Sequence, residues 1–491
     1  MSFNSWSLID GNFPAVTKVP PPIINTALLF ERCPCIEKVE EAIHGFQFFD
    51  RFKLVPKYDS RSCVWIFDDT CTECKASDMI SSVKVNGEEE MLAALHKASM
   101  EDIPGYNETP AFRILRVENV GTGLSSILLR IHHVIGDGIS LVSAMGQAFT
   151  DADGAPVQID IPQLTGRKGK GKGRGKGFND DENSESKIKA KTPKFSLRLL
   201  CDVVVSFFKV LALPAGSFDS DILFTTKDKS KLTMTPSRKF VYFPTVKLDF
   251  VKSLKNKAVV TINDVMMAAT AGAIRRYCLA HKDPLLSQPD ATTMNRALIP
   301  VAFPRSSRES SDPAKAMRNK WAFVSSELPI SVPSCTGRLT ACNAAMNSLK
   351  SSTIAFIQLW VQTNLLPLLP GFLQKGTCLD LFKRHSMVFS NVPGPDKTFY
   401  FAGEQMVGIQ VLFPNLLTQT MIISYNGGLF MNMIVDDELI HDTDKLKEYY
   451  REELKELAVE YGVPSDESEM FLPPTHYGAQ LSAAKDEVCC N

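Results

Sequence analysis

The chain has 491 residues, 44% of them hydrophobic, which is enough for two large packed domains. Its 54 Lys and Arg residues balance 55 Asp and Glu residues at a net charge of −1, which excludes the overall basic character of a nucleic-acid-binding protein. Residues 1–11 lack a charged segment followed by an apolar one, so we expect no signal peptide.

The 12 cysteines are scattered, apart from a C-x-C pair at Cys33 and Cys35 and a C-x-x-C pair at Cys71 and Cys74. A structural zinc site needs four ligands at a recognisable spacing, and the two pairs could combine to supply them. Reduced thiols in a protein that faces the cytosol fit the scattered distribution better. We therefore expect no bound metal.

Strand and helix patterns alternate through the first part of the chain. Short apolar runs bounded by turn residues predict strands, whereas apolar residues that recur every three or four positions predict helices. The predicted strands cover 23–30, 112–117 and 124–130, and the predicted helices cover 36–46, 91–100 and 139–149. A strand therefore runs into a helix at about residues 131–138.

This junction carries His132, His133, Asp137 and Gly138 in an H-H-x-x-x-D-G pattern. A neutral imidazole can take a proton from a hydroxyl, because the histidine pKa lies near neutral pH. Neighbouring residues that leave a strand point in opposite directions, so only one of the two histidines can face a given cleft. Asp137 can cap the following helix, and it lies either near the His133 imidazole or turned toward a cation.

The H-H-x-x-x-D-G pattern predicts a base-catalysis site. The alternative is a zinc site, because histidine and aspartate also ligate zinc. No third ligand cluster lies nearby in the sequence, and no H-E-x-x-H spacing occurs, so base catalysis is the stronger interpretation.

Residues 166–177 alternate glycine with lysine or arginine, and a mixed acidic and basic segment follows up to residue 192. Such a composition cannot bury a core, so we predict a disordered segment. It is either a solvated linker between two halves of the protein or a basic arm that touches anionic lipid headgroups.

Two apolar stretches, 195–213 and 354–372, could contact a membrane. The first has one apolar helical face, but Asp202 and Lys209 argue against a membrane span. An interfacial amphipathic helix and an ordinary helix with a buried face both remain open for this stretch. Proline and polar residues interrupt the second stretch, which is also not a convincing span.

The second part of the chain contains a predicted helix that begins with Thr261, Asn263 and Asp264. Thr261 and Asp264 have the spacing of a helix-start capping box, and the small residues that follow would let this helix pack closely on a neighbour. Further on, 389–395 predicts a tight turn, and 422–429 predicts a strand that ends in a hairpin.

The H-H-x-x-x-D-G pattern resembles the signature of the CoA-dependent acyltransferase superfamily. This superfamily includes the wax ester synthase/diacylglycerol acyltransferases and the condensation domains of nonribosomal peptide synthetases. Segments after this motif resemble the first of these branches only. They are T-x-N-D-V at 261–265, a strand at 298–305, Asn319 to Phe323 after Arg318 in place of the family's glycine, S-N-V-P-G-P at 390–395 and S-Y-N-G at 424–427. All the matches together run in that family's order from about residue 21 to about residue 461.

On this basis the chain is identified as a member of the wax ester synthase/diacylglycerol acyltransferase family. The resemblance implies an α+β fold of two chloramphenicol-acetyltransferase-like halves, each a mixed sheet with flanking helices, with an active-site tunnel between them. The expected boundaries are 1–165 for the first half, 166–192 for the linker, 193–465 for the second half with the family's C-terminal region at about 295–460, and 466–491 for a loose tail. Lipidation of Cys489 and Cys490 in that tail stays open.

The resemblance also implies acyl transfer from acyl-CoA, as a substrate and without a further cofactor, to a fatty alcohol or diacylglycerol. His133 would be the general base, His132 would support its loop, and Asp137 would hold the geometry by pairing with an arginine. Gly138 would permit the turn. We expect association with the cytosolic side of the endoplasmic reticulum membrane or with lipid droplets, and no nucleic-acid partner.

Asn263 is a candidate to stabilise the oxyanion, and with Asp264 it is expected to support the site. Two other functions remain in view. One is a related enzyme that acylates an amine or a carrier-bound acceptor, although no carrier module accompanies the chain. The other is a non-catalytic lipid-binding or lipid-droplet protein, although His132, His133 and Asp137 are all present.

Overall fold

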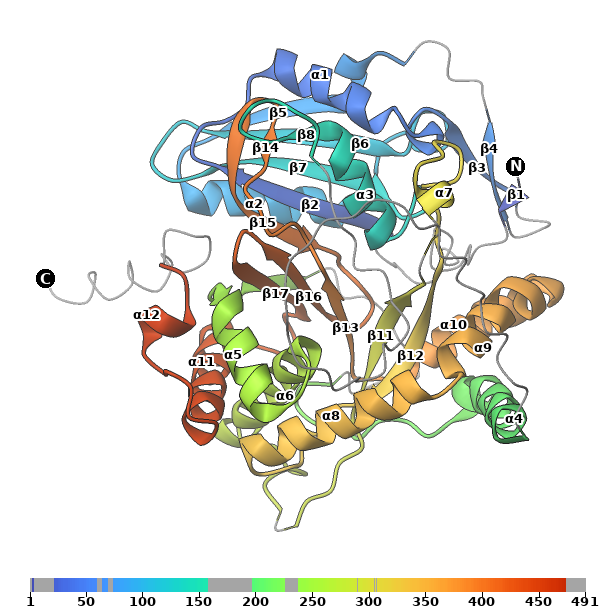
Figure 1. Cartoon of the computed structure of the whole chain (residues 1–491), viewed down its shortest axis with the longest axis vertical. Helices are drawn as coiled ribbons and strands as arrows, with labels where there is room; N and C mark the ends of the chain where they lie inside the picture. Colours follow the sequence, from blue (N-terminus) through green and yellow to red (C-terminus); the bar gives the residue numbers. More distant parts are fainter. Residues whose placement is uncertain are drawn as a thin grey trace, which may run out of the picture.

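Two seven-stranded sheets with helices on their outer faces form the body of the protein in this computed structural model (Figure 1). The structure describes residues 2–3, 22–59, 64–68, 74–157, 197–225, 237–288, 290–303, 305 and 307–473. The expected α+β fold is confirmed. The expected linker at 166–192 and the cysteines Cys489 and Cys490 lie outside the described residues.

The first sheet is built around two long, fully paired antiparallel strands, β2 and β7. Every residue of β7 is buried, as expected for the centre of a sheet that is covered on both faces. Along the sheet the strands are β5 (Ile80–Val85), β6 (Phe112–Asn119), β7 (Ser125–His132), β2 (Ile23–Phe30), β15 (Glu404–Leu412), β14 (Tyr400–Phe401) and β8 (Phe149–Thr150).

The side chains of β2 and β7 pack alternately into two hydrophobic cores, one on each face of the sheet, because successive residues of a strand point to opposite faces. Leu28 and Ile127 pack with α1 (Ile36–Phe46) and α3 (Gly138–Ala148). Leu29 and Leu128 pack with α2 (Glu88–Met100) on the other face. The strands and helices predicted for this half are therefore present, with ends that differ by a few residues.

The second sheet runs β10 (Val246–Lys247), β17 (Gly428–Asp436), β16 (Thr418–Tyr425), β13 (Met387–Val392), β11 (Arg296–Ala302) and β12 (Trp321–Glu327), and β9 (Arg238–Tyr242) also pairs with β17. The helices α5 (Leu248–Ala258), α6 (Ile262–Ala280), α8 (Cys335–Ser351) and α11 (Thr443–Glu460) cover its lower face in Figure 1. Asn426 and Gly427, both with positive φ, join β16 to β17, which confirms the predicted hairpin.

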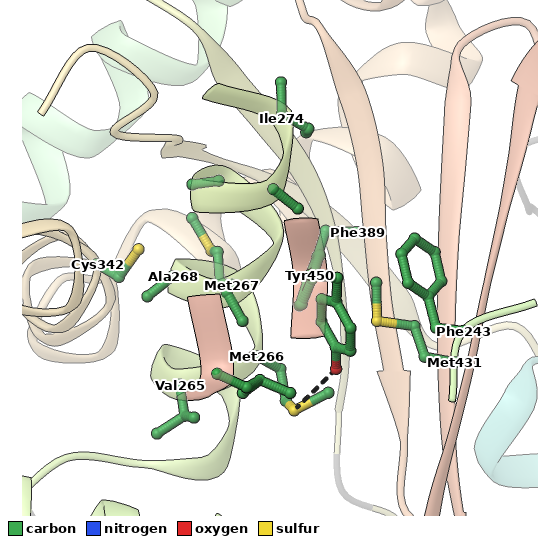
Figure 2. Close-up of a cluster of buried hydrophobic side chains, with 14 of the residues drawn as sticks. Phe243, Val265, Met266, Met267, Ala268, Ile274, Cys342, Phe389, Met431 and Tyr450 are labelled. Atoms are coloured by element: carbon green, nitrogen blue, oxygen red, sulfur yellow. Dashed lines mark hydrogen bonds between the residues drawn. The ribbon is translucent and has the colours of Figure 1, made fainter. Parts of the chain in front are cut away.

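The core below the second sheet is centred on α6, whose small residues allow close packing (Figure 2). Met266 meets the Tyr450 hydroxyl of α11, which donates a weak hydrogen bond to the sulfur at 3.9 Å. A Cβ at Gly272 would lie 2.0 Å from the Glu453 carboxyl carbon, so only glycine admits this buried carboxylate. The predicted close packing of α6 is confirmed.

The two halves are interleaved rather than consecutive in the sequence. β14 and β15 lie within the range expected for the second half, yet they complete the first sheet, where β15 pairs with β2. β2 would otherwise be an open edge with unpaired backbone groups, and β15 supplies their hydrogen bonds. The short helix α12 (Glu467–Met470) also departs from the prediction of a loose tail, because Met470 and Phe471 are buried beside β10.

The remaining elements lie around these two sheets. They are the small sheet β1 (Ser2–Phe3), β4 (Val64–Asp68) and β3 (Val55–Asp59), the helices α4 (Leu197–Ala212), α7 (Ser307–Ser310), α9 (Ile354–Trp360) and α10 (Gly371–Lys383), the π-helical turn Val361–Leu365 and the 3-10 turns Asp50–Phe52, Ala76–Met79, Leu213–Ala215 and Leu366–Leu368. Among the described residues no single helix is long and apolar enough to cross a membrane. The pair α5 and α6 reaches that length and composition only together, across a bend of 97°.

The cysteines follow the expectation of reduced thiols at six described positions and depart from it at one. Cys74 is disulfide-bonded, so the prediction of a reduced thiol is wrong there. The free thiols are Cys33, Cys35, Cys201, Cys278, Cys335 and Cys342. The described residues contain no group of three or more His, Cys, Asp or Glu side chains that could hold a metal ion.

Candidate active site

A cavity of about 1030 Å³ lies where the two sheets meet. Both halves supply its mostly apolar walls, which include Ile24, Leu129, Met145, Ile299, Val301, Trp321, Phe323, Met346, Phe389, Val411 and Met421. A few polar side chains are set into these walls: His133, Asp137, Asn263, Ser390, Asn391 and Gln419. Such a chamber can hold a long apolar ligand while a small polar group at one point acts on it.

His133 is the histidine of the pair that faces the cavity. Its backbone is held from both sides, since its N–H donates to the Pro22 carbonyl at 2.8 Å and its carbonyl accepts from Asn319 Nδ2 at 2.7 Å. Its ring lies between Trp321 and Phe413, with centroids 5.7 and 5.9 Å away. The imidazole is therefore presented to the cavity from a fixed backbone and against aromatic walls.

His132 points the other way, into the packed interior of the first half. Its ring stacks on Tyr106 and meets Trp65 edge-on, with centroids 5.1 and 5.5 Å away. Its Nδ1 accepts from the Val134 N–H at 3.2 Å, which leaves the proton of the neutral ring on Nε2. Burial, with a smaller contribution from His133, lowers the pKa of His132 to about 3, so this ring is neutral at physiological pH.

Asp137 caps α3, as predicted, and it turns toward a cation rather than toward His133. Its Oδ1 accepts from the Ser140 N–H at 2.9 Å, and one Arg305 nitrogen bonds both carboxylate oxygens at 2.9 and 2.7 Å. The Lys320 N–H adds a third donor at 2.9 Å. The side chains of Asp137 and Arg305 are each only 5% exposed, so this ion pair locks the H-H-x-x-x-D-G segment to the second half.

Arg51 also supports this segment, although the sequence analysis did not identify it as a site residue. Its guanidinium donates to the Val134 and Ile135 carbonyls at 2.9 and 3.2 Å, from a buried position. These two carbonyls belong to the turn between His133 and α3, where no strand or helix would satisfy them. Arg51 therefore stabilises the turn between His133 and α3 from the protein interior.

The crowded glycine of the motif is Gly136 rather than Gly138. Gly138 does not have a positive φ, and a Cβ there would meet Val392 at ordinary contact distances of 3.4 and 3.7 Å. A Cβ at Gly136 would lie 2.8 Å from Ser140 Cβ, which requires a shift. The expectation that Gly138 permits the turn is therefore wrong, because the first residue of α3 needs only helical dihedral angles.

Arg318, which replaces the glycine of the resembling families, is accommodated without strain. It does not have a positive φ, and its carbonyl accepts from Arg305 Nη2 at 2.7 Å and from Ser140 Oγ at 2.8 Å. The Asp137 N–H adds a longer bond to the same oxygen at 3.2 Å. The turn before β12 is thus tied to the H-H-x-x-x-D-G segment by backbone atoms that any residue could supply.

Asn263 lines the cavity from the first turn of α6, and Asn391 lies beside it at the end of β13. Asn391 Nδ2 donates to Asn263 Oδ1 at 2.5 Å. The sequence identifies Asn391 only as part of a turn motif, and it does not predict that this residue lines the cavity. The N-terminus of a helix carries partial positive charge, which makes this wall suited to a developing anion.

Asp264 has a different position from Asn263, because it is fully buried and lies outside the cavity lining. Its Oδ2 accepts from the Thr261 N–H at 2.8 Å and from Asn343 Nδ2 at 2.9 Å, and Thr261 Oγ1 accepts from the Asp264 N–H. The predicted capping box is therefore present. It fixes the start of α6 and with it the position of Asn263.

Residues 317–458 match the family described as the WS/DGAT C-terminal domain, close to the region expected at about 295–460. This match identifies the C-terminal part of the chain as the C-terminal domain of the wax ester synthase/diacylglycerol acyltransferase family. A Mycobacterium tuberculosis protein named for diacylglycerol O-acyltransferase activity is 27% identical over 220 residues, which are 42% of this chain and 41% of that relative. The match thus spans less than half of the length of that curated relative.

Two further wax ester synthase/diacylglycerol acyltransferases match more of the chain. Wax ester synthase/diacylglycerol acyltransferase 1 of Arabidopsis thaliana is 24% identical over 348 residues, 66% of each protein. The solved structure of the enzyme from Marinobacter aquaeolei aligns with a TM-score of 0.54 at 14% identity, covering 91% of this chain and 96% of that one. At this identity the structural likeness supports the shared fold, with two sheets around one cavity.

Proposed function

We propose that this protein is an O-acyltransferase that moves a long-chain acyl group from acyl-CoA to the hydroxyl of a fatty alcohol, a diacylglycerol or both. The products are a wax ester and a triacylglycerol. The observation that carries the proposal is the position of His133, the histidine of the motif that faces an apolar cavity of about 1030 Å³ between the two halves. The names of the relatives support the same reaction class.

In the proposed step the His133 imidazole takes the hydroxyl proton of the acceptor while the acceptor oxygen attacks the thioester carbon of acyl-CoA. The C–S bond then breaks, and the imidazolium returns the proton to the departing thiolate. An ester and free CoA result. The acyl group passes directly between substrates, so the step needs no acyl-enzyme and no cofactor.

The other site residues act through position and charge. The bond from Asn391 occupies Asn263 Oδ1, so the Nδ2 group of Asn263 is the donor that would face the thioester oxygen as it becomes negative. Asp137 and Arg305 hold the segment that carries His133, and His132 fills the wall behind it. The apolar walls would receive the acyl chain and exclude water from the thioester.

We also propose that the protein works on the cytosolic side of the endoplasmic reticulum membrane or at a lipid droplet. The proposed acceptors are lipids that partition into these phases. A soluble acyl-CoA would then meet the acceptor inside the cavity.

A competition assay tests the function. Purified protein receives one labelled long-chain acyl-CoA together with a fatty alcohol and a diacylglycerol, and wild type is compared with His133→Ala. Wax ester, triacylglycerol or both should form with wild type and be lost in the variant. Acylation of an amine or a carrier-bound acceptor instead, or lipid binding without any turnover, would replace the proposal with one of the two other functions.

A further inference from the structure

Helix α4 packs two polar residues against the protein beside the buried Val210, and it leaves most of its apolar residues open. Asp202 and Ser206 face the protein, and Ser206 is only 2% exposed. The opposite face is apolar and open, with Phe208 64% exposed. The other open apolar residues of this helix are Leu199, Leu200, Val204, Val205 and Leu211. A helix that met only water would show the reverse distribution.

The segment that begins at α9 repeats this inversion. Gln358 and Gln362, four residues apart, are buried, whereas Phe356 and Trp360 on the other face are 66% and 50% exposed. Leu368 and Leu373 extend the open apolar surface toward α10. Exposed apolar patches on a soluble protein mark interaction sites, and here the aromatic rings are open while the amides, which water would solvate, are turned inward. The repetition therefore points to a non-aqueous environment for this face.

These two inverted helices form one continuous surface, here called the α4–α9 face. The Asp202 carboxylate accepts from the Thr353 N–H at 3.0 Å, and the Ser206 and Thr353 hydroxyls are 3.1 Å apart. Phe207 meets Trp360 edge-on at 6.4 Å. Figure 1 shows α4 next to α9 and α10 at one side of the second half. Polar bonds thus hold α4 in the orientation that turns its apolar side outward.

The α4–α9 face is continuous with the cavity that contains His133. Phe356 belongs to both, since it is mostly exposed and also lines the cavity. Its ring meets the buried ring of Phe303, another lining residue, edge-on at 5.1 Å. Phe356 therefore joins the open apolar surface to the cavity wall, and an apolar molecule on this face would reach the cavity beside it.

The charges around the face fit an anionic lipid surface. Residues 351–374 contain no charged side chain, and the one acidic residue of α4, Asp202, bonds the Thr353 N–H. Lys209 and Lys350 are exposed beside the apolar residues, and Lys350 also lines the cavity. Apolar side chains bordered by lysines are the composition of helices that lie in a membrane interface.

We infer that the α4–α9 face docks on a lipid bilayer, and that the lipid acceptor enters the cavity beside Phe356 directly from that bilayer. The entry route rests on the proposed acyltransferase function, whereas the docking does not. The occupant of the face is a lipid surface rather than a second copy of the chain, because the face reaches the cavity lining at Phe356 and is bordered by lysines, and a protein partner would cover this approach to the cavity.

Flotation of the full chain with phosphatidylcholine vesicles, with and without phosphatidylserine, tests the docking. The variant V204E/F208E places two carboxylates on the face, away from the cavity lining. Its vesicle binding should fall by at least about tenfold, because charged side chains enter the apolar phase at high cost. Val459→Glu is the matched control, since Val459 is 63% exposed on α11 outside the face, and it should bind vesicles as wild type does.

Equal vesicle binding by wild type and V204E/F208E would overturn the inference. A wild-type dimer that the variant converts to a monomer in light scattering would overturn it as well, in favour of a second copy. If the glutamates lower the Tm, V204S/F208S removes the same apolar surface without charge and carries the same expectation of weaker binding.

Turnover separates the docking inference from the proposed function. The variant V204E/F208E should transfer acyl groups to a short, water-soluble alcohol at the wild-type rate, and at least about tenfold more slowly to a diacylglycerol embedded in vesicles. Equal wild-type and variant rates on the embedded acceptor would contradict entry from the bilayer. A wild-type protein that acylates neither of these acceptors nor a fatty alcohol embedded in vesicles would contradict the proposed function, while flotation would still decide the docking.

Discussion

The two histidines of the H-H-x-x-x-D-G segment occupy opposite environments although they are neighbours in the chain. His132 ends β7 inside the packed interior of the first half, against Trp65 and Tyr106. His133 lies one residue further, in the cavity between the halves, against Trp321 and Phe413. Of these two adjacent residues, His132 therefore packs in the protein interior and His133 can act on a substrate. Substitution of the two histidines should have different effects.

The largest expected effect is on turnover in His133→Ala. Acyl transfer should fall by about 10²–10⁴-fold, the usual contribution of a general base, while the Tm stays near that of wild type. His132→Ala should keep measurable activity per folded molecule. Initial rates of labelled ester formation, measured for both variants beside wild type, check this difference. Equal residual rates in the two variants would contradict the assignment of His133 as the general base and His132 as a supporting residue.

The second expected effect is on stability, through the ion pair that joins the histidine segment to the second half. Arg305→Ala leaves the Asp137 carboxylate buried without its cation, and the free energy of unfolding should fall by about 3–5 kcal/mol. Urea denaturation measures the change. The double variant Asp137→Asn with Arg305→Ala is the control, and it should recover part of the loss because no buried charge remains. No recovery would mean that Arg305 acts by packing alone.

A smaller stability effect is expected for His132 itself. Replacing its ring by alanine opens a void between Trp65 and Tyr106, so the free energy of unfolding should fall by about 3 kcal/mol. His133→Ala, measured in the same urea titrations, should lose less than about 1 kcal/mol because its ring borders an existing cavity. A larger loss in His133→Ala than in His132→Ala would contradict the assigned environments.

The pH dependence of stability sharpens the same comparison. The pKa of His132 is lowered to about 3, so below pH 6.5 the unfolded chain binds a proton that the folded protein does not. His132 therefore does not lower the folding stability above pH 6.5, and it lowers the stability increasingly as the pH falls below 6.5, by roughly 1 kcal/mol per pH unit. The slope of unfolding free energy against pH should be shallower in His132→Gln than in wild type. Parallel slopes would show that His132 is not held neutral.

The smallest effect is expected outside the described residues. Deleting residues 166–177, the alternating glycine and basic segment, should leave turnover on detergent-solubilised substrate largely intact, since a solvated linker contributes no contacts to the cavity. Steady-state rates of the deletion variant and wild type in detergent provide the measurement. A collapse of the rate would give this segment a role beyond connection.

Local features of the site could be predicted from the sequence, whereas long-range ones could not. The Asp137 cap, the Thr261 capping box and the Asn-Gly hairpin each depend on residues within a few positions of one another. The arginine that pairs with Asp137 was expected, but its identity as Arg305, 168 residues away, required the fold. The role expected for Gly138 was wrong, because its backbone is helical and the crowded glycine of this segment is Gly136.

The same limit applies to the fold and to the surface. The pairing of β15 with β2 joins strands from opposite ends of the chain, and no local pattern marks it. In α4 the spacing of apolar residues predicted one apolar face, but spacing cannot say whether that face is buried. The structure exposes it, because Asp202 and Ser206 bond to Thr353 and turn the polar side inward.

In the proposed mechanism His133 moves a proton and does not itself carry the acyl group. The most direct test mixes the protein with labelled acyl-CoA in the absence of acceptor and measures the intact protein mass, then adds a fatty alcohol or diacylglycerol. We expect no acylated protein before the acceptor is added. Ester should form only after the addition, and it should be absent in His133→Ala. An acyl adduct on the protein that decays into ester when the acceptor arrives would contradict this mechanism.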